Sequence, residues 1–433
     1  MRDIIQTHPE RIILLKYLTL CLSILLVNSF ITPIWGQQPT FKEKSMVQNF
    51  YVINHQQYYW FSSHKKIKKA TEWLAFIKSS EDQQFSSEKL QNTEIQAALN
   101  SKSPIDSTYK KKIDWQITDI VLNFIKTLQQ GNIYFNYDEV STQRDSIYIN
   151  QLLHLKSWER VSKTVKELDC KDPDYMVLKK YVHNSISSKD TIKYKKALLA
   201  MNYRRYFSIN HPSEYIIVNI PAAQADYYKN NSLLINMRIV AGKEKRQTPT
   251  IASYITDITT FPYWNVPHSI GVKEILPKVQ KDDNYLEQEN FDVVDAKGNI
   301  IEESELNWKD YNENNFPYFF RQSTGADNAL GVLKFNFKNP YSIFLHATSW
   351  QGVFKKDDRF LSHGCVRLEK PFELAKALLK NKINIKELKN SKADTPSNTI
   401  TLSHKIPVFI IYMPVAIAGQ NVYFLKDVYG LIQ

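Results

Sequence analysis

The chain has 433 residues, 43% of them hydrophobic, which is enough for two or three domains with apolar cores. Its formal net charge of +12 suits an anionic partner such as a cell-wall polymer or a membrane surface, although abundant lysine explains the charge equally well. No basic stripe interleaved with aromatic residues is present, so no nucleic-acid partner is expected. The 11 glycines form neither a GxGxxG nor a Walker loop, which argues against a nucleotide enzyme.

The N-terminus has the pattern of an export signal. Arg2, Arg11 and Lys16 precede an apolar run over residues 17–34. The run predicts either a cleaved signal peptide or a single inner-membrane anchor over residues 1–36, and the sequence does not separate the two. Everything after it is expected in the periplasm.

Residues 42–206 are predicted to form a helical domain. Apolar side chains recur there at helical spacing and indicate faces that pack into a core. The two clearest sets are Ile67, Ala70, Leu74 and Ile77, and Ile117, Val121, Phe124 and Leu128.

From residue 213 to residue 433 the pattern changes to strands. Leu333, Phe335 and Phe337 alternate with polar residues, as expected for a strand with one buried face. The polar and acidic stretch 272–318 interrupts this pattern and contains several aromatic residues, which favours a lid over a disordered excursion.

Near the C-terminus, one helix is predicted to begin at Pro371, because proline suits the first helical turn. Residues 406–416 and 422–428 are then predicted to form a terminal β-hairpin. The fold class is therefore α+β: a helical N-terminal domain followed by a mainly antiparallel β domain.

The run from Ser362 to Leu368, SHGCVRL, is the strongest chemical signal in the chain. Cys365 is the predicted nucleophile, because a thiol beside an imidazole can attack a carbonyl as thiolate. Gly364 lets the backbone turn so that consecutive amides point at one spot, as an oxyanion hole requires. The alternative is a buried structural cysteine.

His346 is the predicted general base. It lies near the end of the strand-like stretch 341–348, and period-two alternation places it on the face opposite Leu345. The alternative is a structural histidine. His363 has three open roles: assisting Cys365, donating to the substrate, or shaping the turn through its backbone.

Arg367 can hold a substrate carboxylate in bidentate fashion or form an ion pair with a framework carboxylate such as Glu369. Ser362 is expected to order the loop. No CxxC or HExxH pairing is present, and His-x-Cys has poor bite geometry, so His346, His363 and Cys365 are not expected to bind a metal. Cys170 and Cys365 are both expected to be free thiols, without a disulfide framework.

The SHGCVR segment resembles the signature of L,D-transpeptidases with the YkuD-type catalytic domain. The resemblance extends over most of the chain that follows the N-terminal run. The segments that carry it are VAGK at 240–243, FPYWNVP at 261–267, NALG at 328–331, DVYG at 427–430, and, in the helical part, YYW at 58–60 and NYRR at 202–205.

The resemblance implies a helical scaffold domain followed by a catalytic domain with a capping insertion. It implies that Cys365 is the nucleophile, that His346 is the general acid and base, and that the amides around His363 and Gly364 form the oxyanion hole. Ser362, Arg367 and Trp264 are then candidates for substrate binding. This sequence departs from the family at Ala347, where relatives often have glycine or aspartate, at Pro414, often threonine, and in lacking a separate peptidoglycan-binding module.

The implied reaction crosslinks peptidoglycan tetrapeptide stems, which serve as both donor and acceptor, through a thioester that releases D-alanine. It needs no cofactor, and carbapenem-type lactams are expected to acylate the same thiol. Two alternatives stay open: an L,D-carboxypeptidase that uses water as acceptor, and a catalytically silent wall-binding scaffold.

Overall fold

The computed structural model describes residues 40–80, 92–141, 145–155, 159–185, 190–210, 212–389 and 395–432. The predicted signal or anchor over residues 1–36 lies outside these ranges. None of the helices in the described ranges combines the length and the apolar composition needed to span a membrane.

The first part of the chain is helical, as predicted. Its helices are α2 (Thr40–Asn54), α3 (His64–Ser79), α5 (Thr93–Asn100), α6 (Ser107–Gln130), α7 (Asp145–Leu153), α8 (Val161–Leu168), α9 (Pro173–Ser185) and α10 (Thr191–Asn210). Helix α6 is central because its apolar face, which includes Ile117, Val121 and Phe124, is fully buried. Asp106 begins this helix by accepting the amide hydrogens of Thr108 and Tyr109.

One carboxylate is buried in the middle of this helical core. Asp114, on α6, is 0% exposed and accepts hydrogen bonds from the backbone amides of Tyr59, Trp60 and Phe61 at 2.8–2.9 Å. The Tyr51 hydroxyl donates to it as well, at 2.5 Å. Asp114 therefore anchors the short 3₁₀ turn η1 (Trp60–Ser62) to the long helix, and its charge is fully hydrogen-bonded.

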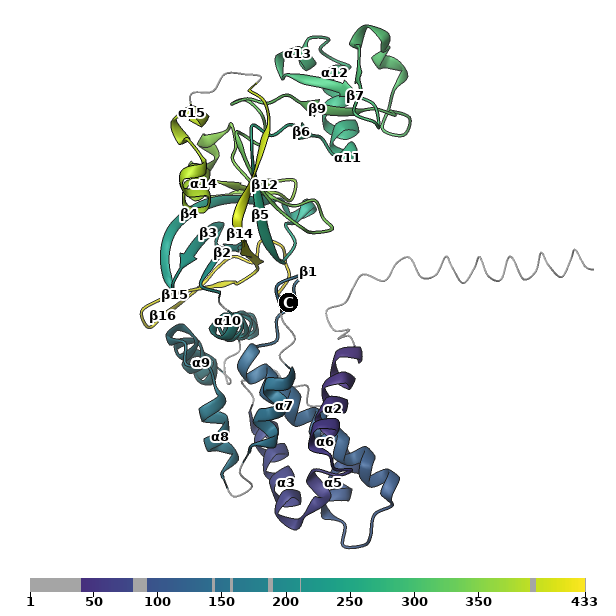
Figure 1. Cartoon of the computed structure of the whole chain (residues 1–433), viewed down its shortest axis with the longest axis vertical. Helices are drawn as coiled ribbons and strands as arrows, with labels where there is room; N and C mark the ends of the chain where they lie inside the picture. The colour runs from purple at the N-terminus through teal and green to yellow at the C-terminus, as the bar shows by residue number, and fades with distance from the viewer. Residues whose placement is uncertain are drawn as a thin grey trace, which may run out of the picture.

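The second part of the chain is a β domain above the helices (Figure 1). The strands of its large sheet are β1 (Tyr137–Asp138), β2 (Glu214–Asn219), β3 (Gln224–Lys229), β4 (Ser232–Gly242), β5 (Ile251–Thr260), β10 (Leu333–Phe337), β11 (Leu345–His346), β12 (Phe360–Ser362), β13 (Val366–Leu368) and β14 (Asn398–Ile411).

The main order is β1-β5-β10-β11-β13-β4-β3-β2-β14, and an additional pairing of β14 with β5 closes the sheet on itself. Most pairings are antiparallel, but β11–β13, β12–β4, β14–β2 and β1–β5 are parallel. Inward-facing residues such as Leu333, Leu345 and Val366 form the core of the closed sheet. Helix α14 (Pro371–Leu379) begins at Pro371 as predicted and buries Leu374 and Leu378 against this core, and α15 (Ile385–Lys389) follows.

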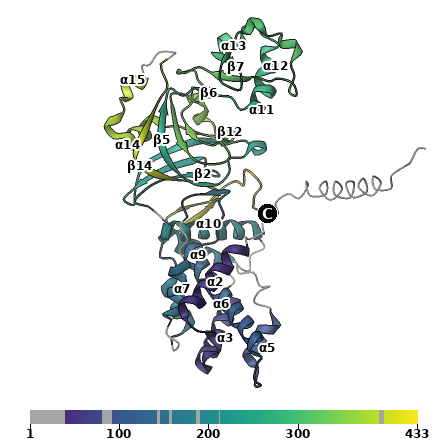
Figure 2. The ribbon, with the colours of Figure 1, turned by 45° about the vertical axis from the view of Figure 1, so that its right-hand side comes forward.

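The predicted terminal hairpin is wrong in its first strand. Residues 406–411 belong to β14, which pairs with β2 and β5, and the hairpin consists of β15 (Val415–Ala418) and β16 (Asn421–Phe424). Pro414 lies between β14 and β15, after the amides of Tyr412 and Met413 have left the ladder to donate to the Tyr203 hydroxyl and the Asn219 side chain. The hairpin packs on α9 and α10 through Val415, so that α10 lies between the helical domain and the β domain in both views (Figures 1 and 2).

The stretch 272–318 is folded, and it forms one unit with the strands that flank it. We call residues 264–322 the capping unit. It has a small sheet of β6 (Trp264–Asn265), β7 (Phe291–Val294), β8 (Ile300–Ile301) and β9 (Phe319–Gln322). Its helical turns are α11 (His268–Ile270), η4 (Gly271–Ile275), α12 (Leu276–Val279) and α13 (Tyr285–Gln288). The 3₁₀ turns η5 (Glu303–Glu305) and η6 (Trp308–Asp310) follow β8.

The capping unit has its own apolar core, built around Leu286, Val293 and Phe320. Figures 1 and 2 show it projecting from the far end of the β domain, away from the helices. The chain enters and leaves it at adjacent points, because Trp264 on β6 pairs with Gln322 on β9. Asn328 joins these points by donating to the carbonyls of Pro262 (3.2 Å) and Ser323 (2.8 Å).

Candidate active site

The two residues predicted to carry the chemistry lie on the same face of two paired strands. β11 runs parallel to β13 with Leu345 opposite Val366 and His346 opposite Arg367, and the Val366 amide donates to the Phe344 carbonyl at 3.1 Å. Cys365 comes directly before β13. Since side chains alternate along a strand, Cys365 and Arg367 share the face of His346, while Leu345 and Val366 face the core.

The antiparallel strand on the other side of β11 adds a cation to this face. Lys334 on β10 pairs with His346, and its ammonium lies 4.3 Å from the centroid of the Phe344 ring. Lys334, His346 and Arg367 therefore form a row across three neighbouring strands. We call this face, with Cys365 beside the row, the reactive face.

The Cys365 thiol is partly exposed and donates to the Ser342 carbonyl at 3.6 Å. Burial of the sulfur raises its pKa to about 11, and the Phe344 backbone and the charges of Lys334 and Arg367 oppose that rise. The resting group is therefore a neutral thiol at pH 7. No hydrogen bond joins it to His346 within the described part of the chain.

The His346 imidazole is 4% exposed, and its Nδ1 has no hydrogen-bond partner among the described residues. Burial and the nearby Arg367 lower its pKa to about 3, while the backbones of Ala347 and Leu330 act in the opposite direction. The imidazole is thus neutral at pH 7 and can accept a proton at Nδ1.

The backbone behind His346 is closely packed. The Ala347 amide donates to the Leu333 carbonyl at 2.8 Å. Gly331 has φ +61°, and a Cβ there would lie 2.8 Å from both the Ala347 Cβ and the Thr348 nitrogen. Gly331 therefore lets the preceding loop approach the backbone that follows His346 closely. The Asn328 side chain fixes this loop by accepting the Leu330 amide hydrogen at 2.7 Å.

Hydrogen bonds within the turn at residues 362–365 hold the backbone that carries the thiol. The Ser362 hydroxyl donates to the Cys365 carbonyl at 2.5 Å and accepts from the Gly364 amide at 3.1 Å. Gly364 has φ +122°, which favours glycine, and its carbonyl accepts from Thr248. Ser362 is itself buried, and both of its hydrogen bonds lie within the turn. The oxyanion hole around His363 and Gly364 stays a prediction. In this structure the Gly364 amide donates to the Ser362 hydroxyl within the turn.

The His363 side chain is hydrogen-bonded to a carboxylate. Its Nε2 lies 2.8 Å from Glu274 Oε1. Glu274 belongs to η4, the π-helical turn of the capping unit, and also lies 3.6 Å from Arg246. The capping unit is therefore tied to the Cys365 loop. Sequence reasoning missed Glu274, because nothing in the sequence places residue 274 beside residue 363.

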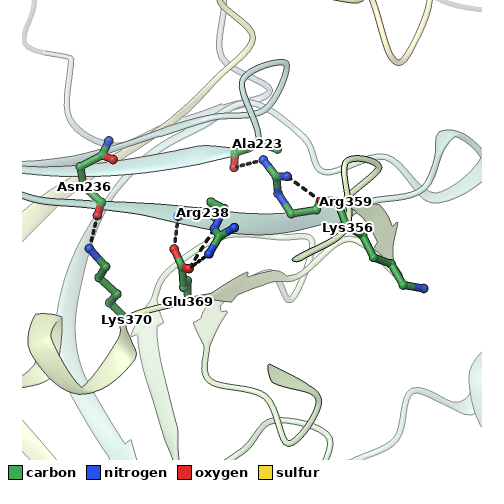
Figure 3. Close-up of polar contacts among 7 residues, drawn as sticks. All are labelled: Ala223, Asn236, Arg238, Lys356, Arg359, Glu369 and Lys370. Atoms are coloured by element: carbon green, nitrogen blue, oxygen red, sulfur yellow. Dashed lines mark hydrogen bonds and ion pairs between the residues drawn. The ribbon is translucent and has the colours of Figure 1, made fainter. Parts of the chain in front are cut away.

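Of the other candidates, Trp264 lies in the capping unit and packs on Phe291, with ring centroids 6.0 Å apart. Glu369 pairs with Arg238, as Figure 3 shows, and the described residues contain no ion pair between Glu369 and Arg367. Cys170 is a buried free thiol in a separate apolar cluster. Lys334 was not among the predicted site residues. The only signal for it in the sequence was the alternation over residues 333–337, which places Lys334 on the face opposite the buried Leu333 and Phe335.

Comparison with known proteins gives two domain matches. Residues 213–393 match the model of the L,D-transpeptidase catalytic domain (YkuD), and residues 45–181 match the Scaffold domain. A protein of Haemophilus influenzae named as a candidate L,D-transpeptidase is 35% identical over 233 residues, which cover 54% of this chain and 47% of the relative. The chain spans about half the length of that curated relative.

Among solved structures, an Enterococcus faecium L,D-transpeptidase matches with 13% identity, covering 46% of this chain and 50% of the other, at a TM-score of 0.22. A Mycobacterium smegmatis L,D-transpeptidase matches with 13% identity, covering 46% and 58%, at a TM-score of 0.21. The two domain matches lie one after the other, with the Scaffold match over residues 45–181 preceding the match to the L,D-transpeptidase catalytic domain over residues 213–393.

Proposed function

We propose that the chain is a cysteine-dependent L,D-transpeptidase that crosslinks peptidoglycan stem peptides. The observation that carries the proposal is the shared face of Cys365 and His346 on paired parallel strands, with the sulfur partly exposed and the imidazole Nδ1 unpartnered among the described residues. The catalytic-domain match over residues 213–393 supports the same reaction class.

In the first half-reaction, Cys365 Sγ attacks the carbonyl carbon that precedes the terminal D-alanine of a tetrapeptide stem. The thiol proton passes to His346, so the two neutral groups become charged only as the new bond forms. The carbon–nitrogen bond then breaks, His346 protonates the leaving nitrogen, and D-alanine departs from a thioester.

In the second half-reaction, a side-chain amine of another stem attacks the thioester. His346 removes the proton of the amine and returns it to the sulfur, which restores the starting enzyme. The peptide bond that forms has the same bond type as the one that broke, so the transfer needs no external energy source and no cofactor. Strained lactams present a similar carbonyl, and carbapenems are expected to acylate Cys365.

Purified protein and tetrapeptide muropeptides test the proposal. The wild type is expected to form crosslinked dimers and to gain the mass of one carbapenem on Cys365, while Cys365→Ala shows neither by intact-mass measurement. The matched control is Cys170→Ala, which removes a thiol away from the reactive face and should retain both reactions.

The outcomes separate the possible reactions. Tripeptides without dimers would indicate a carboxypeptidase that uses water as acceptor. Dimers formed by Cys365→Ala, or the absence of both products and adduct from the folded wild type, would contradict the proposal. Localisation in the periplasm, by signal peptide or anchor, is a further part of the proposal, and fractionation of cells that express the full chain tests it.

A further inference from the structure

Two cations of the reactive face have no anionic partner among the described residues. Those residues offer the Arg367 guanidinium neither an ion pair nor a hydrogen bond, and its Nε is buried without a partner. Lys334 forms no ion pair within the same ranges. The negative charge of Asp257 favours the charged form of Lys334, but the two groups form no ion pair. The Asp257 carboxylate instead accepts hydrogen bonds from Asn336 and Thr256.

The other arginines of the β domain and its capping unit all have oxygen partners. Arg359 donates to the carbonyls of Lys356 and Ala223, and Figure 3 shows it beside the Arg238–Glu369 pair. The remaining pairs are Arg246–Glu274 and Arg321–Asp292. A partly buried guanidinium normally needs such a partner, because removing a charge from water is costly. Arg367 departs from this pattern, and it does so beside the nucleophile.

The position of the cations relative to His346 indicates which anion they bind. Lys334 and Arg367 lie opposite His346 on the two flanking strands, so one cation stands on each side of the imidazole along the sheet. Strands are about 4.8 Å apart, which places the two Cα atoms roughly 10 Å from each other, within reach of one anion held between the two long side chains.

His346 must approach the nitrogen of the departing D-amino acid. In that amino acid a single carbon separates the nitrogen from the carboxylate. A nitrogen held at the imidazole therefore brings its carboxylate to the flanking cations. This carboxylate is ionised at neutral pH and needs charge-assisted partners once it leaves water.

We propose that Lys334 and Arg367 together bind the terminal carboxylate of the acyl-donor peptide and thereby select stems that end in a free D-amino acid. The inference rests on the proposed function, because it names the part of the substrate that the reactive face recognises. Before substrate binds, the same cations attract any small anion that approaches Cys365.

The first experiment measures that attraction without needing turnover. Iodoacetate and iodoacetamide alkylate a thiolate by the same displacement of iodide, but only iodoacetate carries a carboxylate. The ratio of their rates at Cys365, read by peptide mass spectrometry, is expected to fall about tenfold in Arg367→Gln and further in the double variant with Lys334→Gln. Lys338→Gln, which removes an exposed charge just after the same strand, should leave the ratio unchanged.

The ratio distinguishes carboxylate binding from simple stabilisation of the thiolate. If the cations only stabilised the thiolate, both reagents would slow equally and the ratio would stay constant, which would overturn the proposal. Arg367→Lys retains the charge and is expected to retain most of the preference for iodoacetate. Thermal unfolding gives a second check, because removing an unpaired cation should not lower the melting temperature, whereas breaking an ion pair would.

The second experiment compares tetrapeptide donors that end in D-alanine and in D-alaninamide. The wild type is expected to have a kcat/KM at least about tenfold higher for the free acid, and the double variant is expected to lose the preference. Equal rates for both peptides in the wild type would overturn the inference while leaving the transpeptidase proposal intact. Failure of both peptides would contradict the proposed function, and the iodoacetate ratio would still test the cation pair.

Discussion

Two of the buried polar clusters among the described residues invite comparison. In the helical domain, Asp114 receives a hydrogen bond from each of three backbone amides and from a tyrosine hydroxyl. On the reactive face, the His346 Nδ1 and the Arg367 Nε are buried without partners among the described residues. A satisfied cluster holds the chain together, whereas an unsatisfied one retains binding capacity for a substrate.

Replacing Asp114 provides the largest test of this comparison. Asp114→Ala is expected to lower the free energy of unfolding of the helical domain by at least about 3 kcal/mol, because it leaves three amides and the Tyr51 hydroxyl without an acceptor. Chemical denaturation followed by circular dichroism measures the loss. Asp119→Ala, on the same helix, should cost less than about 1 kcal/mol. Equal losses for the two variants would mean that the buried carboxylate is not the anchor.

Gly331 tests how strictly the base is positioned. Gly331→Ala is expected to reduce kcat about a hundredfold with little effect on KM, because the added Cβ would displace the backbone that follows His346. Gly298→Ala is the matched control, since Gly298 also has positive φ (+87°) but a Cβ added there would meet no atom within 4 Å. Both variants introduce about 1 kcal/mol of backbone strain, Gly331→Ala loses further stability through its contacts at 2.8 Å, and only Gly331→Ala should lose activity.

The pH dependence of stability tests the other side of the comparison, the buried imidazole of the reactive face. The pKa of His346 falls from its ordinary value of 6.5 to about 3 in the folded protein, so the unfolded chain binds a proton more readily. The folded state therefore loses stability as the pH falls below 6.5 toward 3. His346→Asn is expected to lose less stability over this window, as measured by melting temperature at each pH.

His183→Asn is the control for that measurement, because His183 is exposed on α9. It should reproduce the wild-type pH curve. A curve for His346→Asn that is parallel to that of the wild type would show that the buried imidazole does not contribute to acid sensitivity, and would weaken the comparison between the two clusters.

Part of this arrangement could be read from the sequence. The helical and β regions, and the helix at Pro371, follow from periodicity and local residue preferences. Cys365 and His346 stand out through residue type and strand alternation, and the structure places them on one face. The domain boundaries and the roles of these residues stay predictions.

The rest depends on contacts between distant segments. The parallel pairing of β11 with β13 and the Glu274–His363 hydrogen bond join residues that local patterns do not relate. Asp114 looks like an ordinary polar residue within a helix until the turn at residues 59–61 folds onto it. The C-terminal hairpin was misassigned because residues 406–411 read equally well as a hairpin arm and as a central strand.

The adjacent entry and exit of the capping unit make it separable from the closed sheet. Because β6 and β9 pair at the base and Asn328 links the Pro262 and Ser323 carbonyls, a short connector across that junction would bridge the chain without stretching the sheet. A change in the length or sequence of this insertion can therefore leave the strands that carry Cys365 and His346 in place.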